Sequence, residues 1–399
     1  MAKIRRSERD TLAQQAAYLS AVHGASQTQI GRLLGGISQA VVSRLIKHAE
    51  REGWLERRLI FHEEKLPKDR LEALRRLAVP PRLFEALKAL GAGSGVCIRN
   101  LRIVDTGKSK DSTRAMDARL HRFGHFAAPH VSSLIQRSEV FAVTWGSTVS
   151  HVIAGLEALT PAMEIRHSIA FVPVCAEPTD QSSNRDTSSR LALRLQSLTR
   201  STGPPIRTPS LSGVQALIPR TFRGAEMKTI RKFVEQTASY TEIFGLAEPL
   251  INKVDSVLTS VGPSSRPMGF IHEELIRAGG TETQPLTKAR LAALVAGDIG
   301  GVLLPLPGLG KAGLREVDEL NRMWTGINRG HLARIARQAD GTKRPGVIVV
   351  SCGADRAEIV AEVVRCGLVN ELIVDRELAD RLAKQLGADR SSAPPAARP

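Results

Sequence analysis

The chain has 399 residues, of which 42% are hydrophobic, and its 56 Lys and Arg against 40 Asp and Glu give a net charge of +16. This hydrophobic content argues against a disordered chain, and the length predicts two or three domains. The excess of positive charge favours a polyanionic partner: nucleic acid, an anionic membrane or a phosphorylated small molecule.

The sequence contains neither an apolar run of about 18 residues nor a signal-peptide core in its first residues, MAKIRRSERD. We therefore expect a cytoplasmic protein without a membrane partner. His121 and His125 stand four residues apart, as two ligands on one helix would, but no third ligand is near them, so we expect no metal and no cofactor. Four widely spaced cysteines form no CxxC pair, and we interpret them as buried thiols: Cys97, Cys175, Cys352 and Cys366.

The first 54 residues predict three helices. Small and apolar side chains repeat with helical spacing in residues 8–23. In SQTQIGRLLGGISQAVVSRLIKHAEREGW (26–54), two short helical patterns meet at a Gly-Gly turn. Ile30, Leu33 and Leu34 share one face of the first pattern. Ser38 is placed to cap the second by accepting a bond from a backbone N–H.

The last of these helices leaves small, hydrogen-bonding and cationic side chains outside its apolar stripe, as a recognition helix in a DNA major groove requires. Lys and Arg outnumber Asp and Glu ten to five in residues 1–60, which favours phosphate contacts. We therefore predict a helix-turn-helix DNA-binding domain over residues 1–61, in which WLERRLIF forms a short strand or wing. An ordinary helical hairpin with a solvated basic face is the alternative. The candidate DNA-binding residues are Gln39, Ala40, Ser43, Arg44 and Lys47.

Residues 62–94 predict a helical linker, because the charged helical pattern LPKDRLEALRRLAVPPRLFEALKAL is broken by two prolines and ended by GAGSG. Such a linker suits a hinge between a DNA-binding domain and the rest of the chain, or a surface on which protomers pair. The sequence leaves both roles open.

Residues 95–388 alternate β-rich apolar runs with helical patterns, which predicts an α/β domain with a mostly parallel, Rossmann-like sheet. The tail, residues 389–399, has no apolar pattern and is expected to be disordered. Helices are expected at 112–123, 148–159, 226–239 and 355–366, and strands at 96–104, 139–145, 167–174, 254–262, 346–353 and 371–375.

Three of these strands run into glycine and polar residues, at 144–148, 260–266 and 351–356. Ligands of open α/β sheets bind beyond the carboxyl ends of the strands, so we expect the three turns to line one crevice. The first turn precedes a helix and offers backbone N–H groups and hydroxyls as a phosphate cradle. Asp298 follows an apolar helix in the sequence AGDIGG, where we predict a glycine-rich loop. It would bind ligand hydroxyls there or simply cap a turn.

Five ordered blocks of the chain resemble transcriptional regulators of the SorC family. They are residues 26–53, VTWGSTV (143–149), VDSVLTSVG (254–262), AGDIGG (296–301) and residues 347–383. The resemblance covers nearly the whole chain. It implies a helix-turn-helix joined to a sugar-binding domain with a fold like that of ribose-5-phosphate isomerase and glucosamine-6-phosphate deaminase. It also implies that the effector is a phosphorylated sugar or a related anion.

The resemblance also implies which residues bind the effector. The family's strand-end phosphate turn falls on Gly146, Ser147 and Thr148. Gly262 matches the glycine that ends the next ligand-facing strand, and the acid of the Gly-Asp-Ile block is Asp298. At Arg356 the family usually has a lysine near the phosphate.

The chain departs from the family pattern at several of these turns. Arg356 presents a planar fork where a lysine would present a point charge. Cys352 replaces the first glycine of a pair, and Val174-Cys175 stands where another Gly-Gly pair is usual. Pro305 takes the place of an acid, while Gly308 is kept. These departures imply an unusual effector.

The function we expect is that of a DNA-binding transcriptional regulator, not an enzyme, whose operator affinity a small phosphorylated sugar controls. A homodimer or homotetramer is expected, because helix-turn-helix proteins usually read two half-sites of double-stranded DNA. One alternative is a phosphosugar isomerase or deaminase, against which we weigh the absence of a carboxylate/Lys or carboxylate/His constellation in the glycine-rich turns. Another is a constitutive DNA-binding protein with a vestigial pocket.

Overall fold

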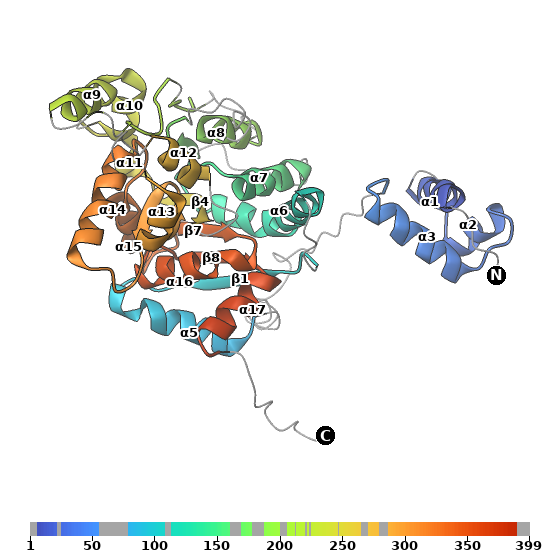
Figure 1. Ribbon diagram of the computed structural model, residues 1–399. Helices are drawn as coiled ribbons and strands as arrows, with labels where there is room; N and C mark the ends of the chain where they lie inside the picture. The colour runs from blue at the N-terminus through green and yellow to red at the C-terminus, as the bar shows by residue number, and fades with distance from the viewer. Residues whose placement is uncertain are drawn as a thin grey trace. The chain divides into compact units, whose positions relative to one another are not determined.

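The computed structural model of the chain describes residues 6–21, 25–55, 79–107, 113–159, 169–177, 187–199, 206–211, 213–219, 222, 225–245, 247–264, 270–278 and 286–388. Its internal contacts divide the chain into an N-terminal unit, Met1–Glu72, and a body, Ala73–Pro399 (Figure 1). The predicted strand or wing after residue 55, the first part of the predicted linker and the C-terminal tail lie outside the described residues.

The described part of the N-terminal unit contains the three predicted helices, α1 (Arg6–Ala21), α2 (Gln27–Leu33) and α3 (Gln39–Arg51). The apolar faces of the helices meet in one small core. Alanines of α1 leave room for the larger side chains of the other two helices to approach it closely. The buried residues of this core are Ala13, Ala16, Ala17, Ile30, Val42, Leu45, Ile46 and Ala49.

The turn between α2 and α3 differs in two details from the expectation. Leu33 is 66% exposed, because α2 ends there and Leu34 packs on the core in its place. Ser38 occupies the N-cap position of α3, but its side chain makes no capping hydrogen bond within the described helix. The capping box lies at α2 instead, where Gln29 N–H donates to Ser26 Oγ (3.3 Å) and Ser26 N–H donates to Gln29 Oε1 (2.8 Å).

The described body is built on one sheet of eight strands, six of which run parallel in the order β1-β8-β7-β4-β2-β3. All six predicted strands are present, and the prediction of a mostly parallel α/β sheet is confirmed. The six strands are β1 (Asn100–Val104), β2 (Val140–Val143), β3 (Ala170–Pro173), β4 (Ser256–Pro263), β7 (Gly346–Ser351) and β8 (Glu371–Asp375).

Helices cover both faces of this sheet (Figure 1). Alternate strand residues point to opposite faces, so that Val347 and Val349 enter one core whereas Ile348 and Val350 enter the other. Three helices pack into the core around Ile348: α6 (Thr113–Ile135), α7 (Ser147–Leu159) and α8 (Ser188–Ser197). The opposite core receives α5 (Pro81–Gly91), α14 (Lys311–Met323), α15 (Arg329–Ala339), α16 (Ala357–Arg365) and α17 (Arg376–Gln385).

The remaining described helices are short and lie mainly between β3 and β5. The predicted helix at 226–239 is two helices, because a second one starts after Thr237. The described part of the predicted linker includes α5, whose Leu83 and Leu87 are buried in the core of the body. The remaining helices, other than α5, are α9 (Ala225–Gln236), α10 (Ala238–Phe244), α11 (Leu250–Lys253), α12 (Phe270–Ala278) and α13 (Lys288–Leu294). Two 3-10 turns are η2 (Ala92–Ser94) and η4 (Ala354–Arg356).

Two strands form a hairpin that the sequence did not predict. The strands β5 (Val295–Ile299) and β6 (Val302–Pro305) pair antiparallel, and β5 pairs with the end of β4. Asp298 therefore lies in a strand opposite Gly262, which corrects the expected glycine-rich loop. The glycines of this segment serve close packing. A Cβ atom on Gly301 would lie 2.2 Å from the Trp324 ring, and one on Gly297 would lie 2.3 Å from the Gly262 carbonyl oxygen.

The four cysteines differ in their burial. Cys175 and Cys352 are buried as predicted, whereas Cys366 is only half-buried. Cys97 is exposed because it alternates with buried Val96 and Ile98. Among the described residues no three His, Cys, Asp or Glu side chains gather as a metal site, and none of the helices described has the length and hydropathy of a membrane span.

The helices α6 and α7 touch through their backbones. A Cβ atom on Gly124 of α6 would lie 2.0 Å from the His151 carbonyl oxygen, and one on Gly155 of α7 would lie 2.4 Å from the Gly124 carbonyl oxygen. Backbone atoms cannot rotate away as a side chain can, so any larger residue at either position must push the helices apart.

We expect Gly124→Ala to destabilise the body by about 1–3 kcal/mol through overpacking. This loss exceeds the roughly 1 kcal/mol that alanine gains in helix propensity. Urea unfolding measures the difference. Gly313→Ala in α14 is the matched control, because the three atoms nearest to its Cβ all belong to the flexible Leu309 side chain. Equal stability of the two variants would contradict the backbone contact.

Candidate functional site

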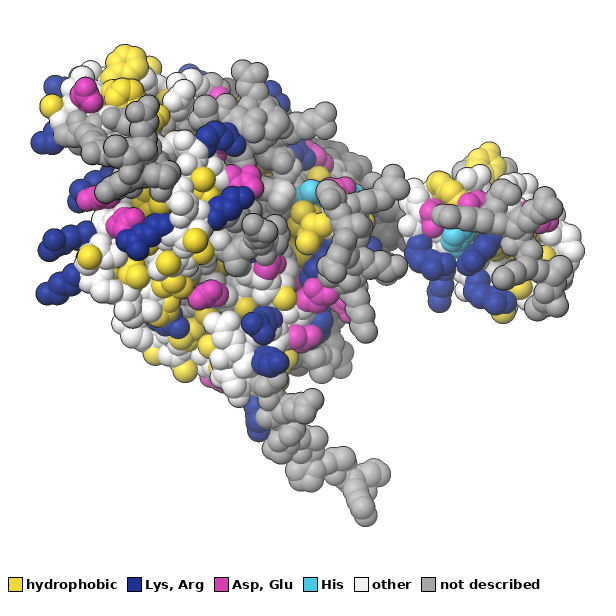
Figure 2. Space-filling view, viewed as in Figure 1, with side chains coloured by type: hydrophobic (Ala, Val, Ile, Leu, Met, Phe, Trp, Pro, Cys, Tyr) yellow, Lys and Arg dark blue, Asp and Glu magenta, His cyan; other side chains and the backbone are white. Residues whose placement is uncertain are grey.

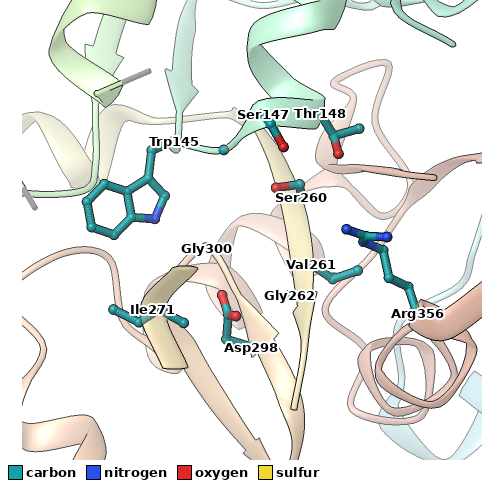
Figure 3. A pocket seen from close by; sticks show the side chains of 11 residues that line it. Trp145, Ser147, Thr148, Ser260, Val261, Gly262, Ile271, Asp298, Gly300 and Arg356 are labelled. Atoms are coloured by element: carbon teal, nitrogen blue, oxygen red, sulfur yellow. The ribbon is translucent and has the colours of Figure 1, made fainter. Parts of the chain in front are cut away.

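A pocket of ≈160 Å³ lies at the carboxyl ends of β2, β4 and β7, and Figure 3 shows its lining. A cavity of about 150 Å³ holds a benzene-sized molecule, so this pocket has room for a small ligand. Residues from all three predicted turns meet here with the β5–β6 hairpin. The lining residues are Trp145, Gly146, Ser147, Thr148, Ser260, Val261, Gly262, Ile271, Asp298, Gly300 and Arg356, which include all six predicted effector residues.

One wall of the pocket is the first turn of α7, which begins at Ser147. The first N–H groups of a helix have no partner within it and lie at the positive end of its dipole, so they favour an anion. Ser147 is exposed and Thr148 is buried beside it. Gly146 has a φ of +127°, and a Cβ atom there would lie 2.7 Å from Ser260 Oγ. Glycine is thus required where the two strand ends approach each other.

Arg356 stands across the pocket from Trp145 (Figure 3). It ends the turn η4 and precedes α16. Its Nη1 donates to the Cys352 carbonyl oxygen and to Asp355 Oδ1, the latter at 3.1 Å. Its buried Nε has no hydrogen-bond partner among the described residues. The guanidinium therefore has donor capacity left for a ligand.

A buried ion-pair cluster supports the turn that carries Arg356. Asp375, at the end of β8, accepts a hydrogen bond from Gly353 N–H (3.0 Å) and caps α17. Arg119 of α6 pairs with Asp375 and, at 2.7 Å, with Glu377, while its Nε donates to Thr106 Oγ1 at 3.2 Å. These residues are up to 271 positions apart in the sequence, and no sequence pattern pointed to them.

Asp298 and His272 form a polar pair beside the pocket. Asp298 is 6% exposed, and its Oδ2 accepts a hydrogen bond from Gly301 N–H at 2.9 Å. His272, on α12, is fully buried, and its Nδ1 lies 2.8 Å from the Pro263 carbonyl oxygen. A carbonyl only accepts, so Nδ1 carries the proton and Nε2 is an acceptor. Nε2 lies 3.6 Å from Asp298 Oδ1 and has no hydrogen-bond partner in the described chain.

Burial determines the protonation of this pair. It raises the pKa of Asp298 to about 7, although Gly301 N–H and the charge of Arg356 act in the opposite direction. Burial also lowers the pKa of His272 to about 4, against the effect of the Pro263 carbonyl. At neutral pH the imidazole is therefore uncharged, and Asp298 is present in both its protonated and its ionised form. The glycine-rich turns of the sequence showed no carboxylate/His constellation, and the histidine of this pair comes from outside them, from α12, which follows β4.

An aromatic wall completes the pocket. The Trp145 ring lies 5.5 Å from the Trp324 ring, and Trp324 Nε1 donates to the Ile327 carbonyl oxygen at 2.8 Å. The pocket thus combines helix N–H groups, hydroxyls, a guanidinium and a carboxyl group with an apolar ring face. Together these groups suit a small anion that also carries hydroxyls.

A second candidate site lies on α3 of the N-terminal unit. Lys and Arg side chains gather over this helix in Figure 2. Arg44 Nε donates to the Ala40 carbonyl oxygen at 3.3 Å, which holds the side chain along the helix. Of the five predicted DNA-binding residues, Ser43 is half-buried and the others are exposed: Gln39, Ala40, Arg44 and Lys47. An exposed face with two cations and three small or hydrogen-bonding side chains is able to enter a DNA groove.

Comparisons with known proteins relate this architecture to transcriptional regulators. No model of a protein family matches the chain, and no curated protein matches it. Among solved structures, the full-length sorbitol operon regulator SorC from Klebsiella pneumoniae is 17% identical and has a TM-score of 0.50, covering 94% of this chain and 98% of its own.

Two further structures cover about three quarters of the chain. A probable sor operon regulator from Shigella flexneri is 16% identical with a TM-score of 0.51, over 75% of this chain and 97% of its own. A domain of a possible sugar-binding transcriptional regulator from Arthrobacter aurescens TC1 is 19% identical with a TM-score of 0.50, over 76% of this chain and 97% of its own. At these identities the likeness shows the fold, and that fold is the one of SorC-type transcriptional regulators, as the sequence resemblance implied.

Proposed function

We propose that this protein is a DNA-binding transcriptional regulator, not an enzyme, whose operator affinity is controlled by a small phosphorylated sugar or a related anion. The observation that carries the proposal is the convergence of the six predicted effector residues, from four separate stretches of the chain, on one pocket. The fold shared with solved transcriptional regulators and the basic face of α3 support it. The proposed division is a helix-turn-helix domain (1–61), a helical linker (62–94), an effector and oligomerisation domain (95–388) and a disordered tail (389–399).

The pocket chemistry gives each group a role in binding such a ligand. The phosphate lies against the first turn of α7 and receives hydrogen bonds from Ser147, Thr148 and the guanidinium of Arg356. Sugar hydroxyls bond to Asp298, and the apolar face of the sugar lies on Trp145. Because two sites on one protein influence each other reciprocally, a ligand that weakens DNA binding is itself bound less tightly by the DNA complex.

The ligand half of the proposal is tested by tryptophan fluorescence. The chain has three tryptophans, and Trp54→Phe leaves only Trp145 in the pocket wall and Trp324 beside it. In this background we expect at least one member of a pentose- and hexose-phosphate panel to change the emission. Arg356→Gln should weaken that binding by about 10- to 100-fold, as hydrogen bonds to charged groups are worth about 1.5–3 kcal/mol. Arg315→Gln, on the exposed side of α14, should leave it unchanged.

The DNA half is tested at Arg44. Bound genomic fragments first define the operator, and Arg44→Ala should then weaken operator binding by about 1–3 kcal/mol and relax the choice of one base, if the side chain reads guanine. Arg337→Ala, exposed on α15 of the body, is the control and should bind as the unmodified protein does. A uniform loss on all sequences would instead assign Arg44 to a phosphate. Unchanged affinity would remove α3 from the interface.

A phosphosugar isomerase or deaminase is a second candidate function, because the pair Asp298 and His272 resembles an acid–base pair beside a ligand site. We expect no turnover when the sugar-phosphate panel is followed by NMR. Conversion that disappears in Asp298→Ala would favour the enzyme. A constitutive DNA-binding protein with a vestigial pocket would show neither turnover nor thermal stabilisation by any member of the panel.

A further inference from the structure

We propose that His272 is a positioning residue that favours the protonated form of Asp298, and that anion binding to the pocket is coupled to protonation of this carboxyl group. This inference rests on the proposed function of the pocket as an anion site. His272 lies on α12, a helix that the sequence did not connect with the ligand. Through this residue α12 controls the protonation of Asp298 and so the charge of the pocket.

The hydrogen-bond pattern around the pair favours the neutral carboxylic acid. His272 Nδ1 donates to the Pro263 carbonyl oxygen, so its Nε2 lone pair points from a fully buried ring towards Asp298 Oδ1 at 3.6 Å. An ionised Oδ1 is also an acceptor, so its lone pairs would repel the lone pair of Nε2. A protonated Oδ1 is a donor, and a movement of a few tenths of an ångström brings the two atoms to hydrogen-bond distance.

The charges around the pocket determine how strongly protonation of Asp298 affects the binding of an anion. Asp298 is faced by His272 from α12, by Arg356 from η4 and by Cys175 after β3. The described residues of β4 and β6 contribute no titratable side chain, and α16 meets β5 at Gly297 through the apolar Ile359. His272 is uncharged at neutral pH, and burial raises the pKa of the Cys175 thiol far above its ordinary value, so both are neutral.

Arg356 alone does not give the pocket a net positive charge. Its guanidinium lies 3.1 Å from Asp355 Oδ1, and this pair is neutral as a whole. An ionised Asp298 therefore leaves one negative charge at the pocket, whereas a protonated Asp298 leaves none. The anion binds the protonated form more tightly, and by linkage it raises the fraction of Asp298 that holds the proton.

Sulfate is a suitable probe, because it remains a dianion between about pH 5.5 and pH 8.5 and does not titrate itself. We follow its binding to the full-length Trp54→Phe protein by fluorescence, at constant ionic strength. The dissociation constant should be nearly constant at low pH and should rise towards tenfold per pH unit above about pH 7, as the coupled binding of one proton requires.

Two variants separate positioning from mere support of the fold. Asp298→Asn cannot ionise and should bind sulfate at pH 8.5 as tightly as at pH 5.5. His272→Gln places an amide N–H near the carboxylate in place of an acceptor, which favours ionisation. It should move the midpoint of the pH profile down by about one unit without changing the affinity at the acid limit.

The outcomes distinguish this inference from the proposed function. An affinity that is independent of pH, yet lost in Arg356→Gln, would overturn the proton coupling and leave the anion site intact. A pH profile that His272→Gln does not shift would overturn the role of His272. Absence of sulfate binding at every pH would count against the anion site itself and so against both.

Discussion

Replacing Arg119 by Met is expected to destabilise the body by about 3–5 kcal/mol, because it leaves a buried carboxylate without its counter-ion. Arg119 is 3% exposed and Asp375 is fully buried. Asp375 would keep its hydrogen bonds from Gly353 N–H and Thr106, but the positive charge that offsets its desolvation would be gone. The same substitution should weaken ligand binding, because Asp375 holds the turn that leads to Arg356.

Urea unfolding followed by circular dichroism measures this loss. Glu377→Gln is the matched control, because it removes the half-exposed partner of Arg119 and should cost no more than about 1 kcal/mol. Arg119→Lys keeps the charge without the planar fork and should fall between the two. A loss below about 1 kcal/mol for Arg119→Met would show that the cluster contributes little to the native state.

Asp298→Asn should stabilise the body at alkaline pH by up to about 4 kcal/mol. Burial raises the pKa of Asp298 from 3.8 to about 7, and each unit corresponds to about 1.36 kcal/mol. The folded state therefore holds a proton that the unfolded state releases above about pH 4. The stability associated with that proton is fully present below pH 4 and is lost as the pH rises to about 7. Asparagine never ionises, and it still offers an oxygen to Gly301 N–H.

The measurement compares the free energies of unfolding of the variant and the unmodified protein at pH 8.5 and pH 4. His272 has a lowered pKa, so its contribution to stability rises with pH between about 4 and 6.5, but it is present in both proteins and cancels in the difference. Asp318→Asn on the exposed side of α14 controls for the removal of one carboxylate. An equal difference at both pH values would mean that the fold does not raise the pKa of Asp298.

Much of the sheet could be predicted because its strands are short apolar runs between turn residues. The sequences VIVVS and ELIVD are buried on both sides, so a continuous apolar run identifies them without any knowledge of their neighbours. The pocket residues Gly146–Thr148 and Arg356 were predictable for a related reason. They follow such strands directly, and the carboxyl ends of parallel strands meet at one edge.

The hairpin carrying Asp298 was not predictable in this way. Its glycines look like loop residues in the sequence, yet Gly297 and Gly301 are there because the β4 backbone and the Trp324 ring leave no space for a Cβ atom. His272 gave no signal either, since a single histidine in a helical pattern has no partner at any characteristic spacing. Arg119 and Asp375 meet only because α6 crosses the end of β8, a contact between residues 256 positions apart.

The crossing of α6 and α7 has a mechanical consequence. With no side chain between Gly124 and Gly155, the backbones of the two helices are in direct contact, so a shift of one helix presses on the other. With 23 residues, α6 is about 34 Å long. It extends from Arg119, near the end of β8, towards Ser138, which bonds to Ser256 at the start of β4 at 2.8 Å. A ligand that displaces the first turn of α7 therefore acts on a pair of helices that reaches from the carboxyl ends of the parallel strands to their amino ends.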